Sequence, residues 1–154
     1  MLSKTDLLLL SSLQQDASMT TQELGRALDL SPSQASRRRQ RLESEGYISR
    51  VAAHLDPARI GLSIQAFLFV TVDVNGSKTT DSFIGMAREL PGIVGAWSLT
   101  GEASYLLRVF CADLSELRQL VHEVLLQQEC VARVQSHIVL DQSKPDSPLP
   151  IPER

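Results

Sequence analysis

Hydrophobic side chains in the first 45 residues recur at three- and four-residue spacing, a pattern that predicts three amphipathic helices. Each helix follows a Ser or Thr that has Asp, Glu or Gln three residues later. This is the capping-box pattern, in which side chains satisfy two orphan backbone amides. The predicted starts are Ser3, Thr20 and Ser31, and Gly46 ends the third helix. The side chains predicted to face inward are Leu9, Leu10, Leu13, Leu24, Ala27, Leu28, Ala35 and Leu42.

Only Asp29 and Leu30 separate the second predicted helix from the third. So short a connection permits only a tight turn and fixes the two helices at a steep angle, as in a helix-turn-helix. Residues 47–55 contain β-branched side chains and a partly alternating pattern, which predicts a short strand pair beside the helices. The N-terminal unit is therefore predicted to be a winged helix-turn-helix.

Strand and helix patterns alternate after residue 62. Strands are predicted over residues 63–74, 93–99, 105–111 and 131–140, with a turn at Asn75, Gly76 and Ser77. One helix is predicted before Pro91, and another begins at Asp113, where Asp113-Leu114-Ser115-Glu116 reads as a fourth capping box. In the first of these helices, the side chains predicted to face inward are Phe83, Ile84, Met86, Ala87 and Leu90. In the second, they are Leu117, Leu120, Val121, Val124 and Leu125. The fold class is α+β, since the order βαββαβ predicts a ferredoxin-like domain with a four-stranded antiparallel sheet and both helices on one face.

These patterns divide the chain into a DNA-binding unit over residues 1–55, a linker over 56–62, a second domain over 63–141 and a tail over 142–154. Four prolines in the tail predict an extended or disordered segment. The uncovered sheet face carries apolar side chains such as Phe67 and Phe69. A second subunit is predicted to cover this face, and the alternative is that the tail or the linker covers it.

Composition limits the class of protein and its location. The net charge is −3, but Lys and Arg outnumber Asp and Glu slightly in the first 55 residues, so an anionic partner belongs there. Cys111 and Cys130 lie in apolar surroundings without metal-ligand spacing and are predicted to be buried free thiols. No stretch has the length of a secretory signal core or a membrane span, so the expected location is the cytoplasm, without a membrane partner.

The third helix carries the candidate contacts to double-stranded DNA. Its first two turns would meet base edges in the major groove, through Ser33, Ser36 and Arg37. Arg38 and Arg41 share another face and are candidates for phosphate or guanine contacts, whereas Arg39 is expected at the edge of the core with its guanidinium in solvent. The predicted DNA-binding residues are Ser31, Ser33, Gln34, Ser36, Arg37, Arg38 and Arg41.

Three sequence segments resemble the Lrp/AsnC family of transcriptional regulators. They are Leu30-Ser31-Pro32-Ser33, then Arg41-Leu42-Glu43-Ser44-Glu45-Gly46-Tyr47-Ile48, and Thr100-Gly101-Glu102-Ala103-Ser104-Tyr105-Leu106-Leu107. The resemblance covers residues 2 to 144. It implies a winged helix-turn-helix joined to a ligand-sensing domain of the RAM type, dimers that assemble into tetramers or octamers, and a response to amino acids.

The same resemblance implies an effector site at the loop around Gly101 and on the last strand. The residues that it points to are Thr100, Gly101, Glu102, Ser104, His137 and Val139. Glycine permits a tight turn and exposes backbone amides that can hold a carboxylate. The family commonly reads Gly-Asp-aromatic-Asp-Tyr here, so Ser104 replaces one of two acidic positions, and Glu102 and His137 keep alternative readings as a solvated hairpin residue and a satisfied polar residue.

An enzyme and an architectural DNA-binding protein are the alternatives to a regulator. An enzyme is not expected, because the chain has no Gly-rich phosphate loop, no metal-spaced His and Cys set, and scattered histidines without a neighbouring nucleophile. No cofactor is expected beyond an amino-acid effector. An architectural protein that coats DNA without an effector is the alternative, and broad binding to unrelated sequences distinguishes it from a regulator that prefers an operator.

Overall fold

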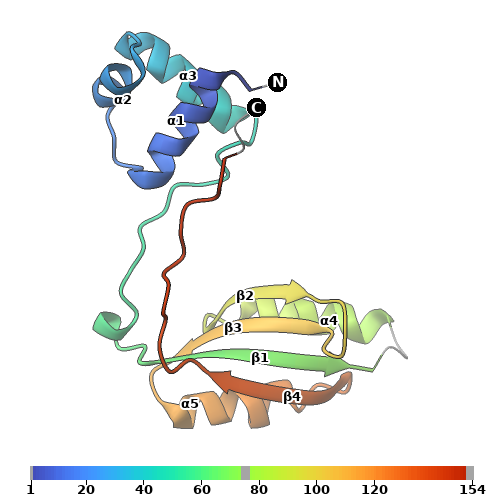
Figure 1. Ribbon diagram of the computed structural model, residues 1–154. Coiled ribbons are helices and arrows are strands. Elements are labelled where there is room, and N and C mark those ends of the chain that lie inside the picture. The colour runs from blue at the N-terminus through green and yellow to red at the C-terminus, as the bar shows by residue number, and fades with distance from the viewer. Residues whose placement is uncertain (1, 74–76, 152–154) are drawn as a thin grey trace. The chain divides into compact units, whose positions relative to one another are not determined.

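The computed structural model describes residues 2–73 and 77–151, and the chain divides into two units (Figure 1). The first comprises Met1–His54 together with Ser143–Arg154, and the second comprises Leu55–Gln142. Each unit has a hydrophobic core of its own. Among the described residues, no helix is long and apolar enough to cross a membrane.

Three helices form the core of the N-terminal unit: α1 (Lys4–Gln15), α2 (Thr21–Leu28) and α3 (Pro32–Ser44). The three capping boxes predicted at Ser3, Thr20 and Ser31 are all present. The prediction that Ala27 faces inward is wrong, because this methyl group is exposed on α2. The buried residues of this core are Leu9, Leu13, Leu24, Ala35 and Leu42.

The turn between α2 and α3 is as tight as the sequence predicts. Asp29 adopts the left-handed conformation, with φ 54°, and the Leu30 amide donates to the Gly25 carbonyl at 2.8 Å. A Cβ atom on Gly25 would lie 2.7 Å from the Leu30 carbonyl oxygen, so only glycine fits this close approach. The helix-turn-helix geometry therefore depends on one buried glycine.

The strand pair predicted over residues 47–55 is not present. The amides of Tyr47 and Ile48 both donate to the Leu42 carbonyl and close the end of α3, and residues 49–55 then continue without secondary structure. This segment lacks a turn dipeptide that would reverse the chain, so it provides no second strand to pair with. Its apolar side chains, Val51 and Leu55, are exposed.

The second unit contains a four-stranded antiparallel sheet in the order β2-β3-β1-β4, which confirms the predicted fold class. The strands are β1 (Ile64–Val72), β2 (Ile93–Ser98), β3 (Tyr105–Cys111) and β4 (Val131–Ile138). A 3₁₀ turn, η1 (Ala58–Ile60), precedes the sheet. The turn predicted at Asn75 and Gly76 lies outside the described residues.

Helices α4 (Ser77–Glu89) and α5 (Leu114–Gln119), with the π-helical segment η2 (Leu120–Leu125), supply the other half of this core. Phe83, Leu117 and Leu125 pack with alternate residues of β1 and β3. The box predicted at Asp113 is only half formed: Asp113 accepts the Glu116 amide at 2.9 Å, but Glu116 binds the Ala112 amide instead of the Asp113 amide. Cys111 and Cys130 are buried and are not joined in a disulfide, as predicted.

The tail has no helix or strand over residues 143–151, and this part of the chain belongs to the N-terminal unit. The side-chain amide of Gln14 in α1 makes two hydrogen bonds with the backbone of Leu149 in the tail.

Candidate DNA-binding and effector sites

The first turn of α3 is held by its own side chains. Ser31 Oγ accepts the Gln34 amide at 3.2 Å, and Gln34 Oε1 accepts the Ser31 amide at 2.9 Å. Ser33 Oγ lies 3.0 Å from Ser31 Oγ. All three side chains are exposed, whereas Ser36 is half-buried. The turn is thus a preformed polar surface at the positive end of a helix dipole.

The arginines of α3 have three different environments. Arg37 is exposed to solvent. Arg39 lies at the core edge as predicted, with its Nε 2.9 Å from Glu43 and its side chain 25% exposed. Arg38 and Arg41 both reach back to Asp6 of α1, at 2.9 and 2.7 Å.

Asp6 is a nearly fully buried carboxylate with a complete set of partners. Its Oδ2 accepts the Ser3 amide and hydroxyl, and its Oδ1 accepts the two guanidinium groups. Burial opposes ionisation, but hydrogen bonds from Ser3, Arg41 and Arg38 outweigh it and hold the pKa of Asp6 well below its usual range. The Asp6 pair raises the pKa of Arg41 in turn. The carboxylate therefore anchors two guanidinium groups of α3 to α1.

The role of Asp6 was missed from the sequence, although a signal was available. Asp6 lies three and seven residues before Leu9 and Leu13, so it shares their inward stripe. A carboxylate on such a stripe is expected to need a cationic partner, because an unpaired buried charge is unfavourable. The sequence does not indicate which arginines supply that partner.

The loop between β2 and β3 is fixed to β1 by one backbone hydrogen bond and two hydrogen bonds that involve side-chain hydroxyls. Gly101 has φ 121°, which L side chains rarely adopt. The Ser104 amide donates to the Val70 carbonyl and Ser104 Oγ accepts the Val72 amide at 3.2 Å, so this side chain ties the loop to β1. Thr71 Oγ1 donates to the Glu102 carbonyl at 3.4 Å. Ser104, which replaces an acidic residue of the family pattern, therefore has hydrogen-bond partners in the backbone of β1.

A depression of about 670 Å³ lies beside this loop, on the sheet face opposite the helices. Phe69 and Leu99 give it apolar surface, and Glu102 and Arg133 contribute opposite charges. The lining residues are Phe69, Thr71, Leu99, Thr100, Glu102, Ala103, Arg133 and Gln135.

The structure brings together only part of the predicted effector set. Thr100 and Glu102 line the depression, and Gly101 and Ser104 shape its loop. His137 and Val139 do not line it: His137 pairs with Phe67 further along β1, and the Val139 amide donates to Gln65. Thr71, Arg133 and Gln135 were missed, although alternation along the first and last strands places them on this face.

Two protein families match most of the chain. The winged helix-turn-helix DNA-binding family matches residues 2–49, and the Lrp/AsnC ligand binding domain matches residues 65–149. A helix-turn-helix joined to such a domain defines a DNA-binding transcriptional regulator. This chain belongs to the Lrp/AsnC family of these regulators, as its sequence resemblance implies.

Individual relatives are similar to this chain over nearly its full length. The DNA-binding transcriptional activator DecR of Escherichia coli strain K12 is 32% identical over 151 residues, covering 98% of this chain and 99% of that protein. The glutamate uptake regulatory protein of Zymomonas mobilis is 30% identical over 148 residues, covering 96% of this chain and 90% of that protein. A transcriptional regulator from Neisseria meningitidis, solved in complex with L-Met, superposes with a TM-score of 0.93 at 34% identity and 97% coverage of both chains. These relatives confirm a regulator and not an enzyme.

Proposed function

We propose that this protein regulates transcription at an operator in response to an amino acid or a closely related metabolite bound beside the loop over residues 99–104. The depression carries this proposal. It combines an apolar side with one acidic and one basic side chain, Glu102 and Arg133, which is the arrangement that a zwitterion with a side chain requires. The L-Met bound to the Neisseria meningitidis relative supports an amino acid as the class of ligand.

A second subunit covers the open sheet face in this proposal. Phe67, Phe69, Leu106 and Phe110 are only half-buried there, and Trp97 on the same face is 48% exposed. A contiguous apolar face of this kind is typical of an interface. Because Phe69 also lines the depression, a partner on this face would enclose the ligand, and dimers can assemble further into tetramers or octamers.

DNA recognition is assigned to the exposed side of α3. Ser33, Ser36 and Arg37 are proposed to meet base edges, and the capping pair Ser31 and Gln34 sets the helix start. Arg38 and Arg41, at 34% and 45% side-chain exposure, are proposed to contact phosphates from the position in which Asp6 holds them. Arg37→Ala should therefore change sequence preference, and Arg41→Ala should weaken binding to all sequences with a shallower salt dependence.

The ligand acts by differential affinity for assembly states. If one assembly encloses the depression more completely, the ligand favours it and changes the spacing between recognition helices. The protein is proposed to do this in the cytoplasm, where its DNA is.

The test begins with thermal unfolding of the whole protein against the twenty amino acids, since a ligand bound only by the folded state raises the unfolding temperature. A hit should also shift sedimentation or operator affinity. Glu102→Gln should abolish the shift, whereas Glu129→Gln, at an exposed position of the same unit, should leave it unchanged. A ligand that binds and changes neither assembly nor DNA affinity would sink the mechanism. Silence across the panel, with equal affinity for unrelated sequences, would favour the architectural alternative.

A further inference from the structure

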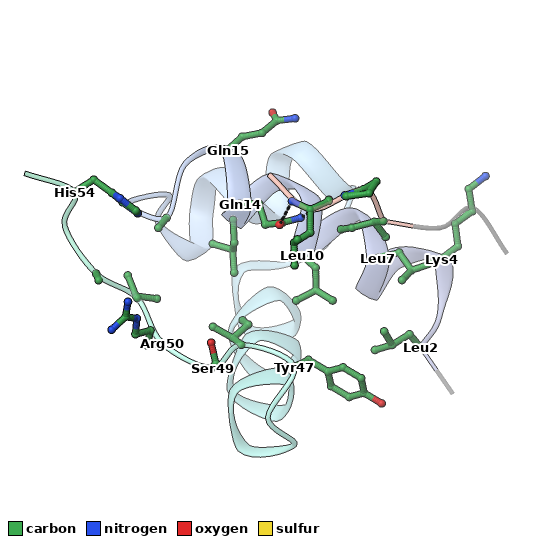
Figure 2. Close-up of a pocket in the computed structure, with 18 residues that line it drawn as sticks. Leu2, Lys4, Leu7, Leu10, Gln14, Gln15, Tyr47, Ser49, Arg50 and His54 are labelled. Atoms are coloured by element: carbon green, nitrogen blue, oxygen red, sulfur yellow. Dashed lines mark hydrogen bonds between the residues drawn. The ribbon is translucent and has the colours of Figure 1, made fainter. Parts of the chain in front are cut away.

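The N-terminal unit contains a second hollow, of about 1020 Å³, that the regulator function described above does not use. It lies between α1 and the segment after α3, with Leu7, Leu10 and Ile48 among its apolar lining (Figure 2). None of its lining residues comes from α3. An occupant of this groove therefore leaves the recognition helix open.

The tail forms one wall of this groove. Leu149, Pro150 and Ile151 line it, and Ile151 is partly buried although it is close to the chain end. Gln14 holds the tail backbone at both polar groups: its Oε1 accepts the Leu149 amide at 2.7 Å, and its Nε2 donates to the Leu149 carbonyl at 3.2 Å (Figure 2). One side-chain amide thus reproduces the paired bonds of a neighbouring strand.

The composition of the tail suits this form of docking. The Leu149 side chain is 76% exposed, so its backbone, and not its side chain, makes the specific contact. Pro148 and Pro150 flank it and favour extended backbone before binding. A segment that is already extended loses less conformational entropy when it docks.

We propose that the tail is a strap that docks in cis on the groove of the DNA-binding unit, so that the chain joins its two units twice. The first connection runs from His54 to β1, and the second runs from the end of β4 back to Gln14. Two connections restrain the helix-turn-helix more than one linker does. Because β4 also carries Arg133 and Gln135, the strap links the strand beside the depression to the DNA-binding unit by covalent chain. Docking of the strap does not require that a ligand exists.

Hydrogen exchange at the Leu149 amide, measured by NMR on the full-length protein, tests the docking. We expect exchange slowed about tenfold relative to Gln14→Ala, the protection that one ordinary hydrogen bond supplies. Leu149→Ala is the matched control, because it keeps the amide and changes only an exposed side chain. Exchange of the Leu149 amide at the rate of an unstructured peptide in the unaltered protein would overturn the proposal.

Two further measurements separate the strap from other arrangements. A synthetic peptide of residues 143–154 should bind a chain that ends at Gln142, and the same peptide carrying Leu149→Pro, which lacks the amide donor, should bind at least about tenfold more weakly. Equal binding of both peptides would contradict the Gln14 contact. Labelled full-length protein should also keep its Leu149 protection after subunit exchange with excess unlabelled Gln14→Ala chains. Loss of that protection would show that the tail occupies a second copy and would overturn docking in cis.

Discussion

Replacement of Asp6 tests whether a single buried carboxylate organises the DNA-binding unit. Asp6→Ala removes the second half of the Ser3 capping box and both guanidinium contacts at once. It leaves Arg38 and Arg41 without their buried partner. The apolar core around Leu9 and Leu13 is not otherwise changed.

The expected loss in free energy of unfolding depends on how deeply Asp6, Arg38 and Arg41 are buried. Removing one partner of a fully buried ion pair costs about 3–5 kcal/mol, because the remaining charge is left unpaired. Here the side chains of Arg38 and Arg41 are 34% and 45% exposed, so water can solvate them after the change. We therefore expect the free energy of unfolding of this unit to fall by about 2–3 kcal/mol, with the lost cap contributing about 1 kcal/mol of that. Asp6→Asn keeps an acceptor for the cap and should lose less.

Hydrogen exchange of the α1–α3 amides in the full-length protein measures this loss for the N-terminal unit alone. Gln40→Ala, at an exposed position of α3, is the control and should change protection only slightly. Protection unchanged in Asp6→Ala would refute the role assigned to the cluster.

The same cluster makes a prediction about pH. Because the pKa of Asp6 is lowered on folding, its contribution is complete above the pKa of about 4 of an unfolded aspartate and is lost as the pH falls toward the folded value. Stability of the unaltered unit should therefore decline in acid below about pH 4, and this decline should be shallower in Asp6→Asn. Identical acid profiles for the two proteins would contradict the assignment.

Three further outcomes are expected. Gly25→Ala should destabilise the N-terminal unit by about 1–3 kcal/mol through contact with the Leu30 carbonyl, whereas Gly85→Ala, with no atom within 4 Å of the new Cβ, should be neutral or stabilising in thermal unfolding. Phe67→Glu should shift sedimentation velocity toward the monomer, and an unchanged sedimentation coefficient would remove the open face as the interface. Burial raises the pKa of the Cys111 thiol, with Glu116 and Asp113 adding to the effect, so iodoacetamide should alkylate it far more slowly in folded protein than in denaturant; equal rates would show that the thiol is accessible.

The sequence by itself determined the features that depend on neighbouring residues. Capping boxes, the short connection at Asp29 and Leu30, and the alternation of apolar residues in the strands act over a few positions, so their patterns predicted the helices, the helix-turn-helix and the βαββαβ order. The strand pair of the wing was predicted from β-branched residues and a partly alternating pattern, and it is absent over residues 47–55, because a strand forms only where a partner strand is available.

Only the tertiary structure decided which distant residues meet. Asp6 lies 32 residues from Arg38, and Gln14 lies 135 residues from Leu149, so no local pattern specifies either contact. The effector set shows the same limit. A family motif pointed to Thr100 and Glu102, but register in the sheet placed Arg133 beside them, and it placed His137 against Phe69, outside the lining of the depression. The register of the strands, and the path that brings the tail back to Gln14, are set by burial of a whole core. A short window of sequence does not contain that information.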